Sequence, residues 1–210
     1  MVPSKAGQSF AAFLPLEFGE PVTDADLDRA WAEVEQAIRN LFGMTALLGQ
    51  LRAATLCIAQ RPLTFDHGGI SVRAVPDLVA FYDDRPPLIV DWKVHAFGTK
   101  DYWLQLVTYA LALTRCKPHR DFPAGFRGCD PTAIRLTEVQ LLTNRLREHT
   151  LEEEDVGEVE DLITDSASRM SLALDGRKLA QTEAADFPVT SYPENCQGCP
   201  FRRPCWEGNG

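Results

Sequence analysis

The chain has 210 residues, of which 45% are hydrophobic and 24% charged, which is usual for a soluble globular domain with a substantial core. It contains neither an apolar run of the roughly 20 residues that a membrane helix needs nor a secretory signal, so we expect a cytoplasmic protein without a membrane span. The net charge of −9 opposes binding to a polyanion, but much of the acid lies in residues 151–161, so the charge permits a nucleic-acid partner without suggesting one.

Two helices are predicted near the start of the chain. Residues 23–26 (TDAD) are typical of a helix N-cap with acid in the first turn, and apolar residues then recur at helical spacing from Leu27 to Leu41. Gly43 can close this helix. A second, short helix is predicted over residues 44–54.

From about Thr55 the pattern changes to that of β-strands. Four strands are predicted, over residues 56–58, 62–65, 70–82 and 87–94. The later elements are a helix over residues 101–115, a strand over 134–142 and a long helix over about 154–174. This order predicts an α/β fold, with one mixed β-sheet flanked by helices.

The strands predicted over residues 70–82 and 87–94 carry charge in otherwise apolar segments. A short acidic turn joins them, so we expect an antiparallel hairpin. Because side chains alternate along a strand, Asp91 and Lys93 should point to one face and Trp92 to the other, and Asp77 should lie near the end of the second strand. Carboxylate oxygens suit Mg²⁺ or Mn²⁺. We predict that Asp77 and Asp91 bind such an ion, and that Lys93 orients a metal-activated water or neutralises developing charge.

The helix predicted over residues 101–115 adds Gln105 and Tyr109, which are four residues apart and share one face. In order, Pro76-Asp77, Asp91-x-Lys93 and Gln105-x-x-x-Tyr109 resemble the motifs of the RecB-like branch of the PD-(D/E)XK nuclease superfamily. The resemblance implies a restriction-endonuclease-like core and metal-dependent cleavage of single- or double-stranded DNA. It also implies metal ligation by both aspartates, catalysis by Lys93, and a substrate-side or supporting role for Gln105 and Tyr109.

The C-terminal tail contains three closely spaced cysteines. Cys196 and Cys199 form a C-x-x-C pair, Cys205 follows, and such thiolates can hold iron or zinc. The tail resembles the cysteine cluster of iron–sulfur nucleases in this branch, including the CRISPR-associated 4Fe-4S exonuclease and the AddB type. This implies a [4Fe-4S] cluster, with Zn²⁺ as the alternative, and protein partners in DNA repair, recombination or antiviral defence. We expect a nuclease-like domain over residues 1–188 and a Cys-rich tail over 189–210 packed on it.

Two features depart from the family pattern. Family members often carry Gly-x-x-x-His on an upstream helix, whereas Gly7 is followed by Ala11 at the histidine position. The site then works without this ligand, uses a carboxylate such as Glu33 or Glu35, or is catalytically impaired. The family's fourth cluster cysteine lies upstream of the nuclease core, and no cysteine precedes Cys57 here.

Alternatives therefore stay open for the cluster and for the function. Cys57, Cys116 or Cys129 could supply the fourth ligand, although each also suits an ordinary core or surface thiol. A catalytically impaired nucleic-acid-binding or assembly module with the same fold is a second candidate function, favoured by the missing histidine and the acidic balance. A third is a different metalloenzyme that uses the cysteine tail as a zinc site.

Overall fold

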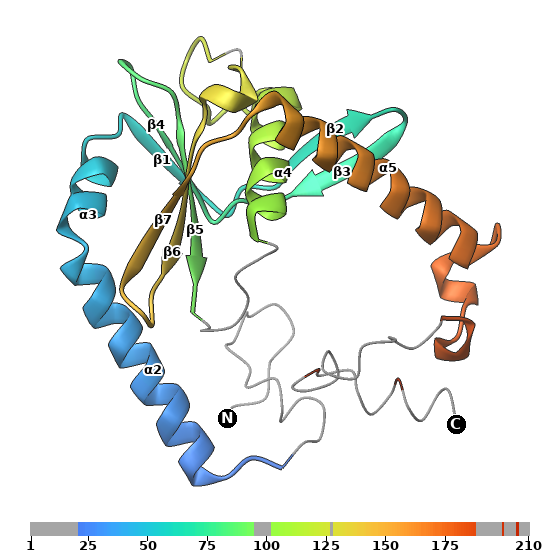
Figure 1. Cartoon of the computed structure of the whole chain (residues 1–210), viewed down its shortest axis with the longest axis horizontal. Helices are drawn as coiled ribbons and strands as arrows, with labels where there is room; N and C mark the ends of the chain where they lie inside the picture. The colour runs from blue at the N-terminus through green and yellow to red at the C-terminus, as the bar shows by residue number, and fades with distance from the viewer. Residues whose placement is uncertain (1–20, 95–101, 127, 188–198, 200–204, 206–210) are drawn as a thin grey trace. The chain divides into compact units, whose positions relative to one another are not determined.

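A computed structural model gives the fold, and it describes residues 21–94, 102–126, 128–187, 199 and 205 (Figure 1). The chain divides into two compact units, one of residues 31–168 and one of residues 1–30 together with 169–210. The sheet and the candidate site belong to the unit of residues 31–168. The predicted boundary at residue 188 lies outside the described residues. No helix in the described ranges is long and apolar enough to span a membrane.

The α-helices of the described ranges are α2 (Asp24–Gly43), α3 (Thr45–Arg52), α4 (Tyr102–Arg115) and α5 (Glu153–Leu174). The strands are β1 (Leu56–Ala59), β2 (Leu63–His67), β3 (Ile70–Ala74), β4 (Leu78–Phe81), β5 (Leu88–Lys93), β6 (Arg135–Gln140) and β7 (Arg145–His149). The same described residues also form three short 3-10 helices, η1 (Pro131–Ala133), η2 (Leu179–Gln181) and η3 (Ala184–Asp186).

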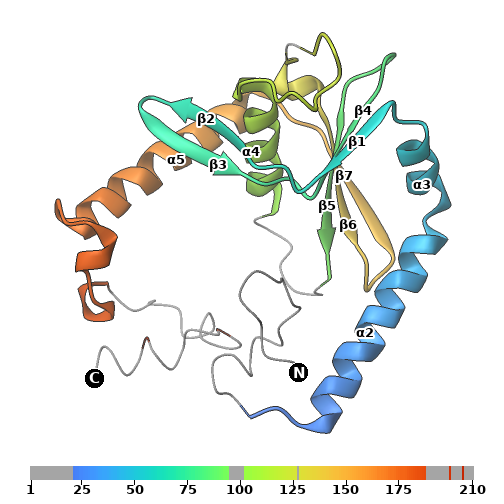
Figure 2. The same ribbon diagram turned by 180° about the vertical axis from the view of Figure 1, so that it is seen from behind.

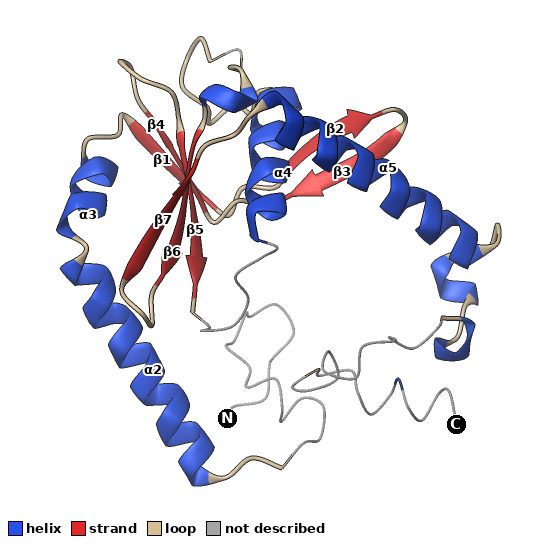
Figure 3. Ribbon diagram, in the orientation of Figure 1, coloured by secondary structure: helices blue, strands red, loops and turns tan. Residues whose placement is uncertain are grey.

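Five strands form a mixed sheet in the order β1-β4-β5-β6-β7, and β2 and β3 form a separate two-stranded sheet (Figure 3). Within the larger sheet β5 and β6 are parallel, and the other neighbours are antiparallel. Helix α4 lies in the connection between the two parallel strands, because a parallel pair needs a crossover. The predicted α/β fold with a mixed sheet flanked by helices is confirmed.

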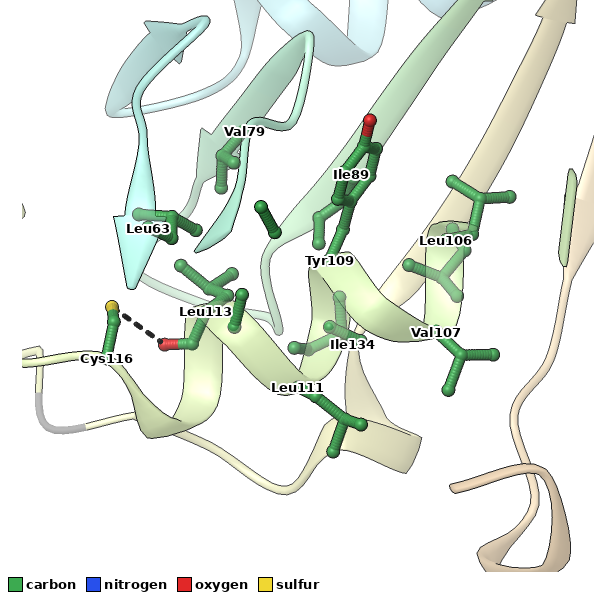
Figure 4. Close-up of a cluster of buried hydrophobic side chains, with 14 of the residues drawn as sticks. Leu63, Val79, Ile89, Leu106, Val107, Tyr109, Leu111, Leu113, Cys116 and Ile134 are labelled. Atoms are coloured by element: carbon green, nitrogen blue, oxygen red, sulfur yellow. Dashed lines mark hydrogen bonds between the residues drawn. The ribbon is translucent and has the colours of Figure 1, made fainter. Parts of the chain in front are cut away.

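Each face of the sheet packs against helices. On one face, Ile89 and Leu136 belong to a buried cluster with α4, including Leu111, and with Val159 of α5; Figure 4 shows part of it. The other face packs against α2 and α3 through a second cluster. Strand β5 is buried on both faces, which accounts for its apolar run from Leu88 to Val90. Figure 2 shows the same layers from behind.

The predicted strand over residues 70–82 is wrong as a single element. It is divided into β3 and β4, and the two belong to different sheets. Pro76 lies between them, and proline has no N–H to donate to a sheet ladder. Strand β3 instead turns back on β2 through Gly68 and Gly69, both with positive φ, as tight hairpin turns prefer.

Strand β7 was not predicted. Its sequence, RLREH, lacks apolar alternation, and all of its residues except the half-buried His149 are exposed. It pairs with β6 at the edge of the sheet, where charged residues discourage pairing with another chain. The strand is thus determined by its neighbour and not by a hydrophobic pattern of its own.

Candidate active site

Strand β5 places Asp91 and Lys93 in the middle of the sheet. Asp91 is 1% exposed and Lys93 is 7% exposed. The Lys93 Nζ atom lies 2.7 Å from Asp91 Oδ2. Both side chains lie on the α4 side of the sheet, whereas Trp92 packs with the cluster on the α2 and α3 side. The expected alternation is therefore present.

Asp77 lies beside the end of β5. It immediately precedes Leu78, the first paired residue of β4, whose partner on β5 is Val90. The Trp92 N–H donates to Asp77 Oδ2 at 2.9 Å, and the Gln60 N–H donates to the Asp77 carbonyl at 3.0 Å. These two bonds hold the side chain and the backbone of Asp77 at this position. The structure thus brings Asp77, Asp91 and Lys93 together where two paired strands end.

Helix α4 extends this group through Gln105 and Tyr109. Lys93 Nζ donates to Gln105 Oε1 at 2.8 Å, and Gln105 Nε2 donates to the Tyr109 hydroxyl. A lysine ammonium only donates, so it fixes which end of the Gln105 amide faces it. Burial raises the pKa of Tyr109 to about 12, so its hydroxyl stays neutral. A continuous chain of polar contacts therefore links Asp91 on β5 to the core of α4.

The electrostatic surroundings of Asp91 favour its neutral form. Burial is the main reason that the pKa of Asp91 is raised, and the nearby Asp77 and Glu138 carboxylates raise it further. Lys93 acts in the opposite direction through its hydrogen bond and its charge. A bound cation would add to the effect of Lys93, because it favours the ionised carboxylate.

Glu138 is a third carboxylate in this neighbourhood that sequence reasoning missed. It lies on β6 directly opposite Asp91 in the parallel ladder and is 0% exposed. Gln140 Nε2 donates to its Oε1 at 2.6 Å. The signal in the sequence is a lone acid among the apolar residues of a strand. Which residue it opposes depends on the register of a parallel pair, and the sequence does not reveal that.

The other candidate ligands are placed differently. Glu33 and Glu35 are exposed on α2, and this helix packs against the sheet face opposite to Asp91, so neither joins the site. Ala11 and Cys196 lie outside the described residues. Cys199 and Cys205 are half-buried.

The three cysteines that could supply a fourth cluster ligand lie in the unit that contains the sheet. Cys57 is exposed, Cys116 is buried and Cys129 is half-buried. Burial raises the pKa of all three thiols, which disfavours the thiolate form that binds a metal.

The carboxylates suit a hard divalent cation by their chemistry. Mg²⁺ commonly takes one or two carboxylates from the protein and completes its shell with waters and substrate phosphates. Asp77 and Asp91 supply that number. In the described ranges, no three His, Cys, Asp or Glu side chains are grouped so that they could hold a metal ion among themselves.

An α/β core with two carboxylates and a lysine at the end of its central strands defines a candidate phosphodiesterase. A family model of the PD-(D/E)XK nuclease superfamily matches residues 8–206, so the chain belongs to this superfamily. Its members are generally metal-dependent nucleases that use Mg²⁺ or Mn²⁺, and such a fold implies nucleic-acid binding.

No curated protein matches the sequence. The crystal structure of SSO0001 is similar over 81% of this chain and 68% of its own, with 12% sequence identity and a TM-score of 0.39.

Proposed function

We propose that this protein is a divalent-metal-dependent deoxyribonuclease of the RecB-like type. The observation that carries the proposal is the group formed by Asp77, Asp91 and Lys93, together with the link from Lys93 to Gln105 and Tyr109. In the sequence the same residues resemble the motif pattern of the RecB-like branch. Membership of the PD-(D/E)XK superfamily supports the nuclease part of the proposal.

Asp77 and Asp91 would hold Mg²⁺ or Mn²⁺, which supplies a more acidic bound water and positive charge against the phosphate. Lys93 is held between Asp91 and Gln105, so its ammonium has a fixed position, and the reacting phosphate would lie beside it. There it orients the attacking water or neutralises the charge that develops on the phosphate oxygens. Gln105 and Tyr109 act as positioning residues, because Gln105 contacts Lys93 and Tyr109 contacts Gln105.

The proposal is tested by cleavage of labelled single- and double-stranded DNA with Mg²⁺ or Mn²⁺. We expect Asp91→Ala and Lys93→Ala each to lower the cleavage rate by about 10²–10³-fold, as the loss of one charge-stabilising group does. Asp84→Ala and Lys117→Ala are matched controls, because both residues are exposed, and they should keep wild-type activity. Full activity in both Asp91→Ala and Lys93→Ala would refute the proposal. Equal cleavage of matched RNA would refute its restriction to DNA.

We also propose that Cys196, Cys199 and Cys205, in a tail of residues 189–210 that follows a nuclease-like domain of residues 1–188, bind a [4Fe-4S] cluster. The C-x-x-C spacing with a third nearby cysteine supports this proposal. Anaerobically purified protein should contain iron and absorb visible light, and Cys199→Ser should lose both properties while Ser171→Ala, at an exposed position, keeps them. Zinc without iron would indicate the alternative metal, and protein with neither would refute the site.

A catalytically impaired nucleic-acid-binding or assembly module is the second candidate. The alanine at the position of the family histidine and the net charge of −9 favour it. Salt-sensitive DNA binding without cleavage under any divalent cation would support this function, and turnover would exclude it. By resemblance, either function would belong to a cytoplasmic repair, recombination or defence complex, and affinity capture that finds no such partner would contradict this setting.

A further inference from the structure

The register of the sheet places polar side chains in two neighbouring rows that lead away from the site. In the first row Asp91 on β5 lies opposite Glu138 on β6, and Glu138 lies opposite Arg147 on β7. In the second row Lys93 lies opposite Gln140, and Gln140 lies opposite Arg145. The three strands lie side by side in both ribbon views (Figures 1 and 2). Each row therefore begins in the candidate active site and ends in an arginine on the edge strand.

Glu138 connects the active site to the edge. Gln140 donates a hydrogen bond to Glu138 Oε1, but Glu138 Oε2 has no hydrogen-bond partner among the described residues. Arg147 Nη1 lies 3.8 Å from Oε1, and His149 Nε2 lies 3.9 Å from Oε2, which is too far for a hydrogen bond. A fully buried carboxylate with such incomplete compensation costs stability. Its position between Asp91 and Arg147 indicates a role in holding Arg147.

Arg147 faces the buried Glu138 carboxylate as an ion pair and still has an accessible side chain. That side chain is 44% exposed, so solvent or a ligand can reach it. Arg145 on the same strand is also exposed. The planar guanidinium group, with five donors, matches a phosphate better than any other side chain does. The edge strand thus presents two such groups on the face that carries the candidate active site.

Asp91 and Glu138 are buried, so a nucleic-acid strand would pass the ends of β5 and β6, where the row of Lys93, Gln140 and Arg145 lies. Neighbouring strands are about 4.8 Å apart, so Arg147 lies roughly 10 Å from Asp91 across two strand spacings. Along a duplex axis one strand of DNA rises about 3.4 Å per nucleotide, and the path along its backbone is longer, so this span corresponds to at most about three nucleotides. A single strand can therefore place one phosphate near Asp91 and another at Arg147.

We propose that Arg145 and Arg147 form a phosphate-binding subsite that holds the nucleic-acid strand a few nucleotides from the scissile phosphate. Glu138 is a positioning residue that fixes Arg147. The proposal rests on the proposed nuclease function, because it takes the phosphate at Asp91 as the reacting one. The other explanation of these arginines is protection of a sheet edge from pairing, which predicts no effect on DNA binding.

Binding is measured by the fluorescence anisotropy of a labelled oligothymidylate, in Ca²⁺ to prevent cleavage, over a series of salt concentrations. Each lost phosphate contact on a single strand lowers the slope of log K against log salt by about 0.7, so we expect Arg145→Ala/Arg147→Ala to lower it by about 1.4. The matched control is the double variant Arg39→Ala/Arg52→Ala, since both residues are exposed on α2 and α3, which cover the opposite face. An unchanged slope in the β7 variant, as in the control, would overturn the subsite.

The kinetic result separates this proposal from the nuclease function. In Mg²⁺, Arg145→Ala/Arg147→Ala should raise KM by about tenfold or more with little change in kcat, because the contact is made equally in ground and transition states. Asp91→Asn should abolish cleavage and keep the wild-type salt slope. Wild-type protein that binds DNA but does not cleave it in Mg²⁺ or Mn²⁺ would refute the nuclease function alone, and a fall in kcat without a rise in KM would refute the subsite alone.

The positioning role of Glu138 is tested by the coupling between variants of Glu138 and Arg147. Glu138→Gln keeps the size of the side chain and should also raise KM. In the Glu138→Gln background, Arg147→Ala should have less effect on KM than it has in the wild type, because the arginine is already displaced. Equal effects in the two backgrounds would exclude the positioning role.

Discussion

Replacement of Lys93 by methionine should destabilise the protein strongly at neutral pH. The Lys93 and Asp91 side chains are almost completely buried, and their charged atoms are 2.7 Å apart. Methionine retains much of the length of lysine without its charge. Removal of one partner of a buried ion pair typically costs about 3–5 kcal/mol, because the other charge remains buried and unpaired. We expect a loss of unfolding free energy in this range.

The loss of unfolding free energy caused by Lys93→Met should become smaller as the pH is lowered. Burial already raises the pKa of Asp91 above its ordinary value of 3.8, and Lys93 is the group that opposes this shift. Without Lys93 the pKa of Asp91 in the folded state rises further, while the unfolded value is unchanged. The folded state then binds the proton more tightly, so stability falls as the pH rises from 3.8 through the folded-state pKa. Lys93→Met therefore destabilises the protein fully above the folded-state pKa of Asp91 and less below it.

Urea unfolding in EDTA, followed by circular dichroism at neutral and at mildly acidic pH, measures both effects. The double variant Lys93→Met/Asp91→Asn provides the matched comparison, because a neutral pair of similar volume removes the unpaired charge. It should be less destabilised than the sum of the single variants, with a coupling of about 3 kcal/mol at neutral pH. The reasoning would be refuted if the losses of the two single variants add to the loss of the double variant within about 0.5 kcal/mol. It would also be refuted if the loss caused by Lys93→Met does not depend on pH.

Three other outcomes are expected. Gln105→Ala should lower kcat by up to about 100-fold in a cleavage assay, because Lys93 loses one of its fixed contacts, whereas Gln105→Glu, which keeps an acceptor, should lose less; equal losses would contradict this. Leu111→Ala should lower the unfolding free energy by about 2–5 kcal/mol in urea titrations, because the side chain is fully buried, and the exposed Leu172→Ala should change it by less than about 0.5 kcal/mol. The pKa of His149 is lowered from 6.5, chiefly by burial, so stability should decline as the pH falls below that value; His149→Gln should flatten the decline, and an unchanged pH profile would count against it.

The local part of the candidate site could be predicted from the sequence. The alternation of side chains along a strand places Asp91 and Lys93 on one face, whatever the strand pairs with. A short turn between two strands makes an antiparallel hairpin, which carries Asp77 to the end of β5. Helical periodicity places Gln105 and Tyr109 on one face of α4. All these inferences depend on geometry within a short stretch of chain.

The parts that depend on distant pairing could not be predicted. Glu138 lies opposite Asp91 only because β6 returns parallel to β5 after the α4 crossover, and no residue pattern specifies that register. Strand β7 has no apolar alternation, so its pairing with β6 gives no signal in the sequence. The division at Pro76 was missed because the residues on both sides have strand propensity, although the proline itself marks the break.

The position of β5 in the middle of the sheet also affects how the protein loses activity on heating. Its neighbours on both sides and the clusters on both faces must separate before Asp91 and Lys93 can move apart. Catalytic groups on mobile loops can be lost by local opening at temperatures where the rest of the protein persists. Here thermal inactivation should coincide with the cooperative melting of the sheet, and residual activity should report the fraction of molecules that remain native.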